Sequence, residues 1–288
     1  MSAEIINGRE LADELRERMK EDVEQLSEQG IVPNLTVIIV GEDPASLSYV
    51  RGKKRASHKI GIHSDLIELP ETTSHQELLH LIQQLNSNDE VHGILVQLPL
   101  PAHINEDEVI ETISPDKDVD GFHPISIGRM MAQKDTFLPC TPLGILTMLD
   151  EKNIDIEGKH AVVLGRSRIV GKPIGQMLLN RNATVTYCHS RTKDLADVLR
   201  QADILIVAIG KPAFITGEHV KKGAVVIDVG INRLEDGTLT GDVDFESASE
   251  QAAYITPVPK GVGPMTITML LQNTIKAAKL KNQVTTRS

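Results

Sequence analysis

The sequence places one lysine where its amine would be buried. A helix predicted over residues 44–60 carries a tyrosine and five cations. At about 100° per residue, Lys53 falls beside the apolar positions of this helix, one turn after Tyr49. The other four cations fall on the far side: Arg51, Lys54, Arg55 and Lys59. Burial would lower the pKa of Lys53 and leave a neutral amine for proton transfer, with the Tyr49 hydroxyl as its hydrogen-bond partner. The alternative is a lysine whose stem covers apolar surface while its ammonium stays in water.

Two further polar side chains stand where an open α/β sheet would hold a ligand. Gln97 ends the strand predicted at 93–97, and Asp120 lies in the loop DKDVDGFHP. Ligands of such sheets bind at the carboxyl ends of the strands. Asp116 and Asp118 are equally suited to be turn residues, and no His or Glu joins them at ligand spacing. We therefore predict no metal site.

A glycine-containing turn in the second half is a candidate phosphate site. The predicted strand at 161–165 ends in Gly165 and is followed by RSRIVGKPIG and a helical run. Backbone amides and the positive end of a helix bind phosphate at such turns. The glycine spacing is not G-x-G-x-x-G, so the motif is weak by itself. Residues 158–193 contain no Asp or Glu and seven cations: Lys159, Arg166, Arg168, Lys172, Arg181, Arg191 and Lys193.

The end of the next predicted strand favours NADP over NAD. A NAD site usually has an acidic residue there, which binds the ribose hydroxyls. Here the strand at 184–188 is followed by His189, Ser190 and Arg191, which suit a 2′-phosphate. The alternative is that these cations scatter over a solvated face.

Apolar periodicity and breaker residues predict the elements that position these residues. In the first half we expect helices at 8–29, 44–60 and 75–85 and strands at 35–41, 64–69 and 93–97. Residues 98–142 predict loops around short helices. In the second half we expect a helix to residue 152, followed by strands at 161–165, 184–188, 204–210 and 224–230. A last helix would run from Pro264 to about 281, and KNQVTTRS would be frayed. Near-continuous apolar strands are typical of a parallel sheet covered on both faces.

The length of 288 residues exceeds that of a usual single domain. We expect an α/β protein of two domains. Residues 1–139 would form an N-terminal domain, with the helix at 264–282 packing back on it. Residues 140–262 would form a Rossmann-like parallel-sheet domain, and the functional site would lie in the cleft between the two.

The composition excludes several classes of protein. Thirty Lys and Arg against 40 Asp and Glu give a net charge of −10, which argues against a nucleic-acid partner. No apolar run is long enough for a membrane span, and the start of the sequence has no signal-peptide pattern, so we expect a cytoplasmic protein. Cys140 and Cys188 are far apart and outside any ligand spacing, which argues against a disulfide or zinc role.

Eight motifs together resemble one enzyme family, the bifunctional methylenetetrahydrofolate dehydrogenase/methenyltetrahydrofolate cyclohydrolases. They are VGEDPASLSYVRGKKRASHKIGI, GILVQLPLP, PDKDVDGFHP, PCTPLGI, GRSRIVGKPIG, GAVVIDVGINR, GDVDF and TPVPKGVGPMTITMLL, and they span nearly the whole chain. The resemblance implies NADP-dependent oxidation of 5,10-methylenetetrahydrofolate and hydrolysis of the product to 10-formyltetrahydrofolate, in one-carbon metabolism. It also implies a homodimer.

The resemblance also implies roles for individual residues. Lys53 would transfer the proton, Tyr49 would assist it and stack on the folate, Gln97 would hydrogen-bond Lys53, and Asp120 would hold the pterin. The remaining implied substrate contacts are Val96, Leu98, Gly261 and Pro264. The implied cofactor contacts are Thr141, Gly165, Arg166, Ser167, Ser190 and Ile231, to which the charge pattern adds Arg191. Cys140 would line the cleft between the domains.

Two positions depart from the family pattern. Lys260 stands where the family usually has glycine, and Ser126 where it usually has asparagine. Lys260 would either bring charge to the site or point to solvent, and both changes bear on the balance of the two activities. Two rival functions stay open from the sequence: another NADP dehydrogenase of similar plan, such as one acting on shikimate, and a non-catalytic nucleotide-binding regulator.

Overall fold

The computed structural model describes residues 2–285, and the chain in it divides into two compact units. One unit, here the large-sheet unit, comprises residues up to Asp13 together with Thr141–Thr266. The other, the small-sheet unit, comprises Glu14–Cys140 together with the chain from Ile267 onward. Both are α/β, as the sequence predicted.

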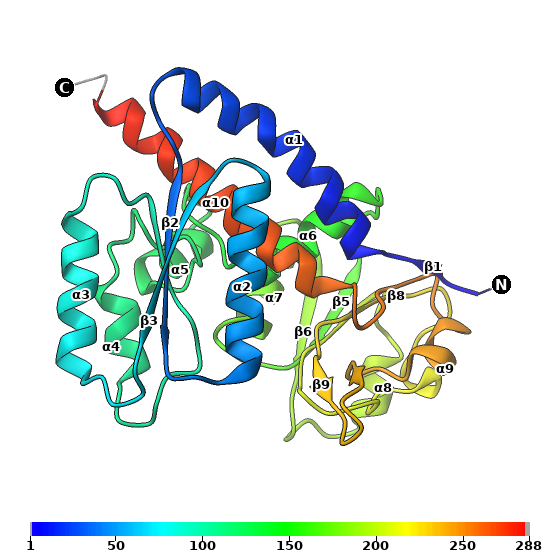
Figure 1. Cartoon of the computed structure of the whole chain (residues 1–288). Helices are drawn as coiled ribbons and strands as arrows, with labels where there is room; N and C mark the ends of the chain where they lie inside the picture. The colour runs from blue at the N-terminus through cyan, green and yellow to red at the C-terminus, as the bar shows by residue number, and fades with distance from the viewer. Residues whose placement is uncertain (1, 286–288) are drawn as a thin grey trace. The chain divides into compact units, whose positions relative to one another are not determined.

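The small-sheet unit is built on three parallel strands in the order β3-β2-β4. They are β2 (Asn34–Val40), β3 (His63–Leu69) and β4 (Gly93–Val96). Helix α2 (Pro44–Lys59) joins β2 to β3, and α3 (His75–Ser87) joins β3 to β4. Because the two crossovers run in opposite directions along the sheet, right-handed connections place α2 and α3 on opposite faces, as Figure 1 shows. The predicted βαβαβ order is confirmed.

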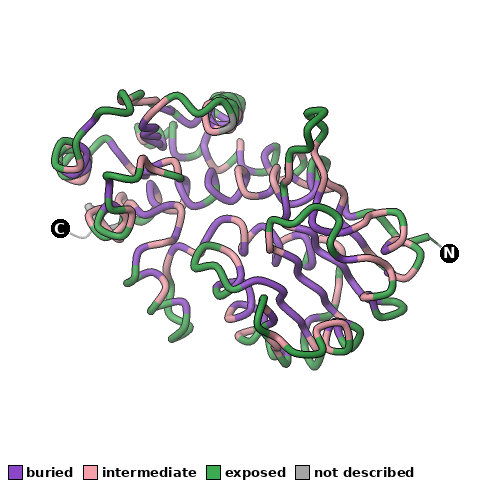
Figure 2. The backbone as a smooth tube through the Cα atoms, turned by 90° about the horizontal axis from the view of Figure 1, so that it is seen from below, coloured by how far each residue is buried: buried purple, intermediate pink, exposed green. Residues whose placement is uncertain are grey.

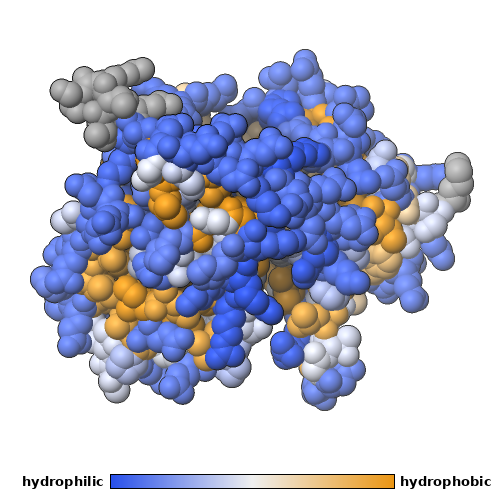
Figure 3. Space-filling model, turned by 45° about the horizontal axis from the view of Figure 1, so that its top comes forward, coloured by the Kyte–Doolittle hydropathy of each residue, from blue (hydrophilic) through white to orange (hydrophobic). Residues whose placement is uncertain are grey.

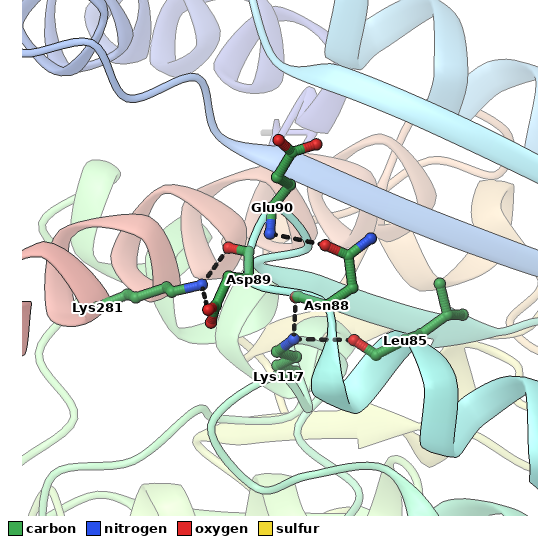
Figure 4. Close-up of polar contacts among 6 residues, drawn as sticks. All are labelled: Leu85, Asn88, Asp89, Glu90, Lys117 and Lys281. Carbon is green, nitrogen blue, oxygen red and sulfur yellow. Dashed lines mark hydrogen bonds and ion pairs between the residues drawn. The ribbon is translucent and has the colours of Figure 1, made fainter.

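Local signals in the sequence fix the ends of α3. The Ser74 hydroxyl and the Glu77 carboxylate form a capping box at the start of the helix. At its other end, Nζ of Lys117 donates to the carbonyls of Leu85 and Asn88 at 2.8 and 2.6 Å (Figure 4). A lysine there satisfies carbonyls that the helix leaves open and complements its negative end. The short helices α4 (Glu106–Thr112) and α5 (Pro124–Met131) lie in the predicted loop-rich stretch.

Two long helices complete the small-sheet unit. Helix α1 (Gly8–Glu28) and helix α10 (Val262–Thr285) lie side by side there (Figure 1). Nζ of Lys279 is 2.7 Å from a carboxylate oxygen of Asp22. Nζ of Lys281 bonds Asp89 in the turn before β4 (Figure 4). We expected the last helix to end at about residue 281 and KNQVTTRS to be frayed. The helix instead continues to Thr285. Residues 286–288 lie outside the described part of the chain.

The large-sheet unit has a six-stranded sheet in the order β1-β11-β8-β7-β5-β6, with all of its pairs parallel. The strands are β1 (Glu4–Ile5), β5 (His160–Leu164), β6 (Thr184–Cys188), β7 (Ile204–Val207), β8 (Val225–Asp228) and β11 (Tyr254–Ile255). The chain turns from β5 to one side for β6 and to the other for β7. This reversal makes the carboxyl ends of β5 and β7 the switch point at which such sheets bind ligands.

Four helices, a 3-10 turn and a hairpin complete this unit. The helices are α6 (Cys140–Glu151), α7 (Gly171–Leu179), α8 (Leu195–Leu199) and α9 (Phe245–Ser249). The 3-10 turn is Gly217–His219, and the hairpin consists of β9 (Asn232–Arg233) and β10 (Leu239–Thr240). The sequence missed the pairs β1–β11 and β9–β10 because each strand has only two residues. The predicted ends of β7 and β8 lie two or three residues too late, because Ala208, Ile209 and Val229 continue the apolar pattern although they lie in loops. Strand β1 places the start of the chain in the large-sheet unit, whereas the expected boundary assigned residues 1–139 to the other half.

Buried residues concentrate along the strands of both sheets. Figure 2 shows long buried stretches of the backbone with exposed residues gathered at the outer turns. In β2, β4, β5, β7 and β8 nearly every residue is buried, which is what continuous apolar strands covered on both faces require. The face drawn in Figure 3 is mostly hydrophilic with smaller hydrophobic areas. Within residues 2–285, no helix combines the length and the apolar character that crossing a membrane requires.

Candidate active site

Helix α2 holds Lys53 inside the small-sheet unit. The carboxylate of Asp43 caps the helix by accepting from the Ser46 amide at 2.7 Å, and Pro44 is its first residue. The side of the helix that carries Lys53 faces inward, so that this residue is only 5% exposed. The other four cations of the helix are exposed. The predicted burial of Lys53 is thus confirmed, and the alternative of a lysine extended along the surface is wrong.

The amine of Lys53 meets Gln97 and the ring of Tyr49. Its Nζ donates to Oε1 of Gln97 at 3.0 Å, and Nε2 of Gln97 donates to the Leu98 carbonyl at 2.7 Å. The second bond fixes which end of the amide faces the lysine. Nζ lies 4.7 Å from the centre of the Tyr49 ring. We expected a hydrogen bond between the Tyr49 hydroxyl and Lys53. The contact is instead between the ammonium group and the face of the ring, since Tyr49 precedes Lys53 by one helical turn.

Opposing effects set the protonation of this cluster. Burial lowers the pKa of Lys53, while the negative charge of Asp120 raises it, and burial dominates. Burial raises the pKa of Asp120, and the charge of Lys53 acts in the opposite direction. A lysine and a carboxyl whose pKa values are both moved toward neutrality are suited to pass a proton to and from a bound ligand.

Cys140 belongs to the same cluster, although its position in the sequence predicted neither a disulfide nor a zinc role for it. Its side chain is buried, and its thiol donates to the Val119 carbonyl at 3.3 Å. Burial, and after it the charge of Asp120, hold the pKa of the thiol well above its ordinary value. Cys140 is therefore a neutral hydrogen-bond donor beside Asp120 and not a nucleophile.

A largely apolar pocket of the small-sheet unit opens at the carboxyl end of β4. Val96 and Leu98, two of the implied substrate contacts, line it together with Asp120. The other lining residues are Ile94, Leu95, Val109, Ile110, Ile113, Asp118 and Phe122. Its cavity volume is only about 20 Å³, roughly the space of one water molecule, and Lys53, Tyr49 and Gln97 do not line it, so the pocket is not itself a ligand site.

In the large-sheet unit, glycines make the turn between β5 and α7 possible. Gly165 has φ +129°, and a Cβ on it would lie 2.3 Å from the Ala208 carbonyl oxygen at the end of β7. A Cβ on Gly171, the first residue of α7, would lie 2.4 Å from the carbonyl oxygen of Gly165. The Ser167 hydroxyl accepts from the Val170 and Gly171 amides, both at 3.2 Å. The turn is therefore tight, and it ends on the positive end of a helix.

Exposed polar residues follow the two neighbouring strand ends. Arg166, Ser167 and Arg168 are exposed after β5, and Ser190 and Arg191 are exposed after β6. Leu164 pairs with Cys188 in the parallel register, so the two segments leave the same edge of the sheet. This arrangement fits a ligand with several phosphates, including a 2′-phosphate. Arg181 is not part of it, because its guanidinium is 2.7 Å from Asp150.

The other implied contacts of this unit lie in loops or in the first turn of a helix. Ile231 is 61% exposed just after β8. The hydroxyls of Thr141 and Thr266 are 2.9 Å apart. Gly261 and Pro264 stand at the start of α10, where Pro264 is the third residue of the helix and not, as predicted, the first. Lys260 is exposed, with φ +83°.

Two buried carboxylates that the sequence analysis overlooked order the loops at this edge. Asp242 accepts from the amides of Ile209, Gly210 and Lys211 at 2.7–2.9 Å and from Nδ2 of Asn232 at 2.9 Å. Asp228 accepts from the amides of Gly230, Asp242 and Val243 at 2.9–3.0 Å. The only signal for them was their place in the motifs AVVIDVG and GDVDF: Asp228 is the last residue of the apolar strand β8, and Asp242 comes two residues after β10.

Comparison with known proteins agrees with this geometry. A family model described as tetrahydrofolate dehydrogenase/cyclohydrolase, catalytic domain, matches residues 6–120. A second, the NAD(P)-binding domain of the same enzymes, matches residues 139–282. The chain belongs to the tetrahydrofolate dehydrogenase/cyclohydrolase family. This membership supports the resemblance seen in the eight motifs and not the shikimate-type alternative.

Individual members of the family are similar over nearly their whole length. The bifunctional protein FolD of Oceanobacillus iheyensis is 64% identical over 282 residues, which cover 98% of this chain and 99% of the relative. The crystal structure of FolD from Campylobacter jejuni has a TM-score of 0.96 at 51% identity and covers 97% of this chain and 99% of that one. The Trypanosoma brucei enzyme, solved in complex with NADP cofactor and inhibitor, has a TM-score of 0.95 at 38% identity, with 98% and 99% covered.

Proposed function

We propose that this chain oxidises 5,10-methylenetetrahydrofolate with NADP and hydrolyses the resulting 5,10-methenyltetrahydrofolate to 10-formyltetrahydrofolate. The observation that carries the proposal is the buried Lys53, hydrogen-bonded to Gln97 in a cluster with Asp120 and Tyr49. Family membership supports both activities, because the curated relatives are named bifunctional and the matched family is described as dehydrogenase/cyclohydrolase.

The folate pterin would lie beside the cluster of Lys53, Gln97 and Asp120. By the family resemblance, Val96 and Leu98 would pack against its ring, and Tyr49 would stack on it. Asp120 would accept hydrogen bonds from the pterin edge, which its partly buried position favours. Gly261 and Pro264 would complete the substrate contacts.

In the oxidation step the chain has to hold two ligands and supply little chemistry of its own. NADP, when bound, accepts the hydride. Gly165, Arg166 and Ser167 would hold its phosphates at the positive end of α7. Ser190 and Arg191 would bind the 2′-phosphate, and Thr141 and Ile231 would contact the remainder of the cofactor. The exposed, carboxylate-free ends of β5 and β6 fit this ligand better than they fit NAD.

In the hydrolysis step Lys53 would handle the proton. Since burial lowers its pKa, the amine exists in the neutral form more readily than an exposed lysine and can take a proton from attacking water. Gln97 would keep the amine oriented by accepting its hydrogen bond. The charge of Asp120 and the ring of Tyr49 would then stabilise the ammonium that forms.

One assay tests the proposal. Purified protein is mixed with 5,10-methylenetetrahydrofolate and NADP, and the absorbance of NADPH and of methenyltetrahydrofolate is followed. We expect NADPH to accumulate while methenyltetrahydrofolate appears and decays faster than without enzyme. NADP binding without any absorbance change would instead support a non-catalytic regulator and overturn the proposal.

The assembly and location of the protein are also proposals. By family resemblance we infer a cytoplasmic homodimer with a small-molecule folate substrate and no nucleic-acid or membrane partner. The net charge of −10 supports the absence of a nucleic-acid partner. Sedimentation analysis tests the assembly: a mass of twice 31.5 kDa is expected, and a monomer at micromolar concentration would contradict it.

A further inference from the structure

A second carboxyl group, Asp118, is buried two residues before Asp120 and has so far no function. Its side chain is only 2% exposed. Oδ1 accepts from the Phe122 amide at 3.2 Å. Oδ2 accepts from the His123 amide and from the Ser126 hydroxyl, both at 2.9 Å. One carboxylate therefore gathers three donors from the chain that follows Asp120, and it closes the loop on which Asp120 stands.

The same loop is fixed on its other side by α10 and by the segment before α6. Nδ2 of Asn273 donates to the carbonyls of Val119 and Leu138, at 2.8 and 3.1 Å. Gly121 has φ +77°, and a Cβ there would lie 2.5 Å from the backbone of Leu138. The backbone on both sides of Asp120 is thus held by buried contacts, and the Asp118 carboxylate supplies three of them.

We propose that Asp118 is a positioning residue, which uses the Phe122 and His123 amides and the Ser126 hydroxyl to hold Asp120 beside Lys53. The inference deepens the proposed function and rests on it. Asp118 would not touch the folate ring in the reaction. Its effect would be transmitted through the backbone of residues 119–123, so its loss would change hydrolysis and folate binding but not the affinity for NADP.

The charge state of Asp118 gives this role a pH signature. Burial, which outweighs the opposing effect of its three donors, raises the pKa of Asp118 to about 7, with a smaller contribution in the same direction from the charge of Asp120. The other titratable groups at this position are Cys140, which feels the Asp118 charge, and His123, whose Nδ1 accepts from the Ile125 amide. Protonation of the Asp118 carboxylate weakens its hydrogen bonds with the Phe122 and His123 amides and the Ser126 hydroxyl. The loop that carries Asp120 should therefore become less tightly held as the pH falls through 7. Ser126→Ala removes a donor to the charged form and should raise the pKa of Asp118 further.

The test measures methenyltetrahydrofolate hydrolysis against pH for the wild type, Ser126→Ala and Asp118→Asn, with the uncatalysed rate subtracted. Ser87→Ala, an exposed serine of α3, is the matched control. We expect the acid limb of Ser126→Ala to move up by about one pH unit, since a hydrogen bond to a charged group is lost. We expect Asp118→Asn to lose at least tenfold in kcat/KM. The Kd for NADP should stay within twofold in both.

Each outcome bears on the inference. A Ser126→Ala profile that superimposes on those of the wild type and the control would overturn it, even where Asp118→Asn fails to fold. An equal loss of NADP affinity in the folded variants would also overturn it, because the effect would then be general. Absence of hydrolysis in the wild type would reject the proposed function itself and this inference with it.

Discussion

The two regions assigned to ligands use charge in opposite ways. The small-sheet unit gathers Lys53, Asp120 and Cys140 in one cluster, where loss of contact with water is the largest influence on each pKa. The large-sheet unit instead exposes its cations at the ends of β5 and β6, next to a glycine turn and the start of α7. The first arrangement changes the protonation of side chains, and the second leaves charges in water where a polyanion can meet them.

This difference decides how readily a buried lysine and an exposed arginine can be recognised in the sequence as site residues. A lysine on an apolar helix face is conspicuous, because an unused lysine there would cost free energy. An exposed arginine is ordinary, and it gains meaning only from the strand end on which it stands. Substitutions should therefore separate the two regions: those in the buried cluster should affect hydrolysis, and those at the exposed edge should affect NADP binding.

The largest expected effect belongs to Lys53→Met, which keeps the volume of the stem and removes the amine. Loss of a positioned proton-transfer group should lower the hydrolysis rate by roughly 10²–10⁴-fold. The Kd for NADP should not change, because the cofactor contacts lie on the other unit. Lys54→Met, an exposed neighbour, is the control and should keep wild-type hydrolysis in the same absorbance assay.

The second prediction concerns Asp228, a buried carboxyl of the large-sheet unit whose pKa is also shifted. Burial raises the pKa of Asp228 to about 6. A carboxyl with a raised folded-state pKa favours the fold most at low pH, and this contribution is lost as the pH rises from about 4 through 6. Relative to Asp228→Asn, which cannot ionise, the wild type should therefore lose on the order of 3 kcal/mol of unfolding free energy over that range.

Denaturant unfolding of both proteins at several pH values measures this difference. Asp228→Asn also turns an NH2 group either toward the amides of Gly230 and Asp242 or toward the amide of Val243, but that cost does not depend on pH. A difference that stays constant from pH 4 to 7 would show that Asp228 is not perturbed. The contrast between the two units would then be sharper than we describe.

Arg191→Ala tests the exposed edge and should have a smaller effect. Removal of one charge-assisted contact to the 2′-phosphate should raise the Kd for NADP about 10- to 100-fold and leave the Kd for NAD nearly unchanged. Lys193→Ala removes the same charge two residues away and serves as the control. Equal weakening of NADP binding by the two substitutions would mean that only the general positive field matters.

The smallest effect is expected at Lys260, an exposed lysine with φ +83°. Glycine adopts this backbone conformation without steric cost, although its unfolded chain is more flexible. Lys260→Gly should therefore raise the unfolding free energy by about 0.5–1 kcal/mol. A drop in thermal midpoint would show that the lysine makes a stabilising contact.

Much of the fold could be predicted because the signals were local. Apolar periodicity, breaker residues and continuous apolar runs predicted α2, α3, β2 and β5 to within a few residues. The two-residue strands β1 and β11 have no such signal, since their pairing depends on partners some 250 positions apart in the sequence. Parallel pairs of this kind follow from the tertiary fold.

The candidate site was predictable in the same uneven way. Lys53 stood out by its helix position, and Gln97 and Asp120 by their places at a strand end and in a loop. Asp118 looked like a turn residue, and it does accept bonds from a turn, but its burial depends on packing that no local pattern contains. Ser126 was noted only as a departure from the family, whereas the structure makes it a buried donor to Asp118.

The state of the Lys53 amine is the quantity on which the account depends most. Protein labelled with carbon-13 at the lysine Cε can be titrated by NMR, with the Lys53 signal identified by its absence in Lys53→Met and the Lys54 signal by its absence in Lys54→Met. We predict that Lys53 titrates clearly below its ordinary pKa of 10.5, because burial outweighs the charge of Asp120. A Lys53 signal that titrates at 10.5 or above would contradict the account, because the amine would then be a permanent cation.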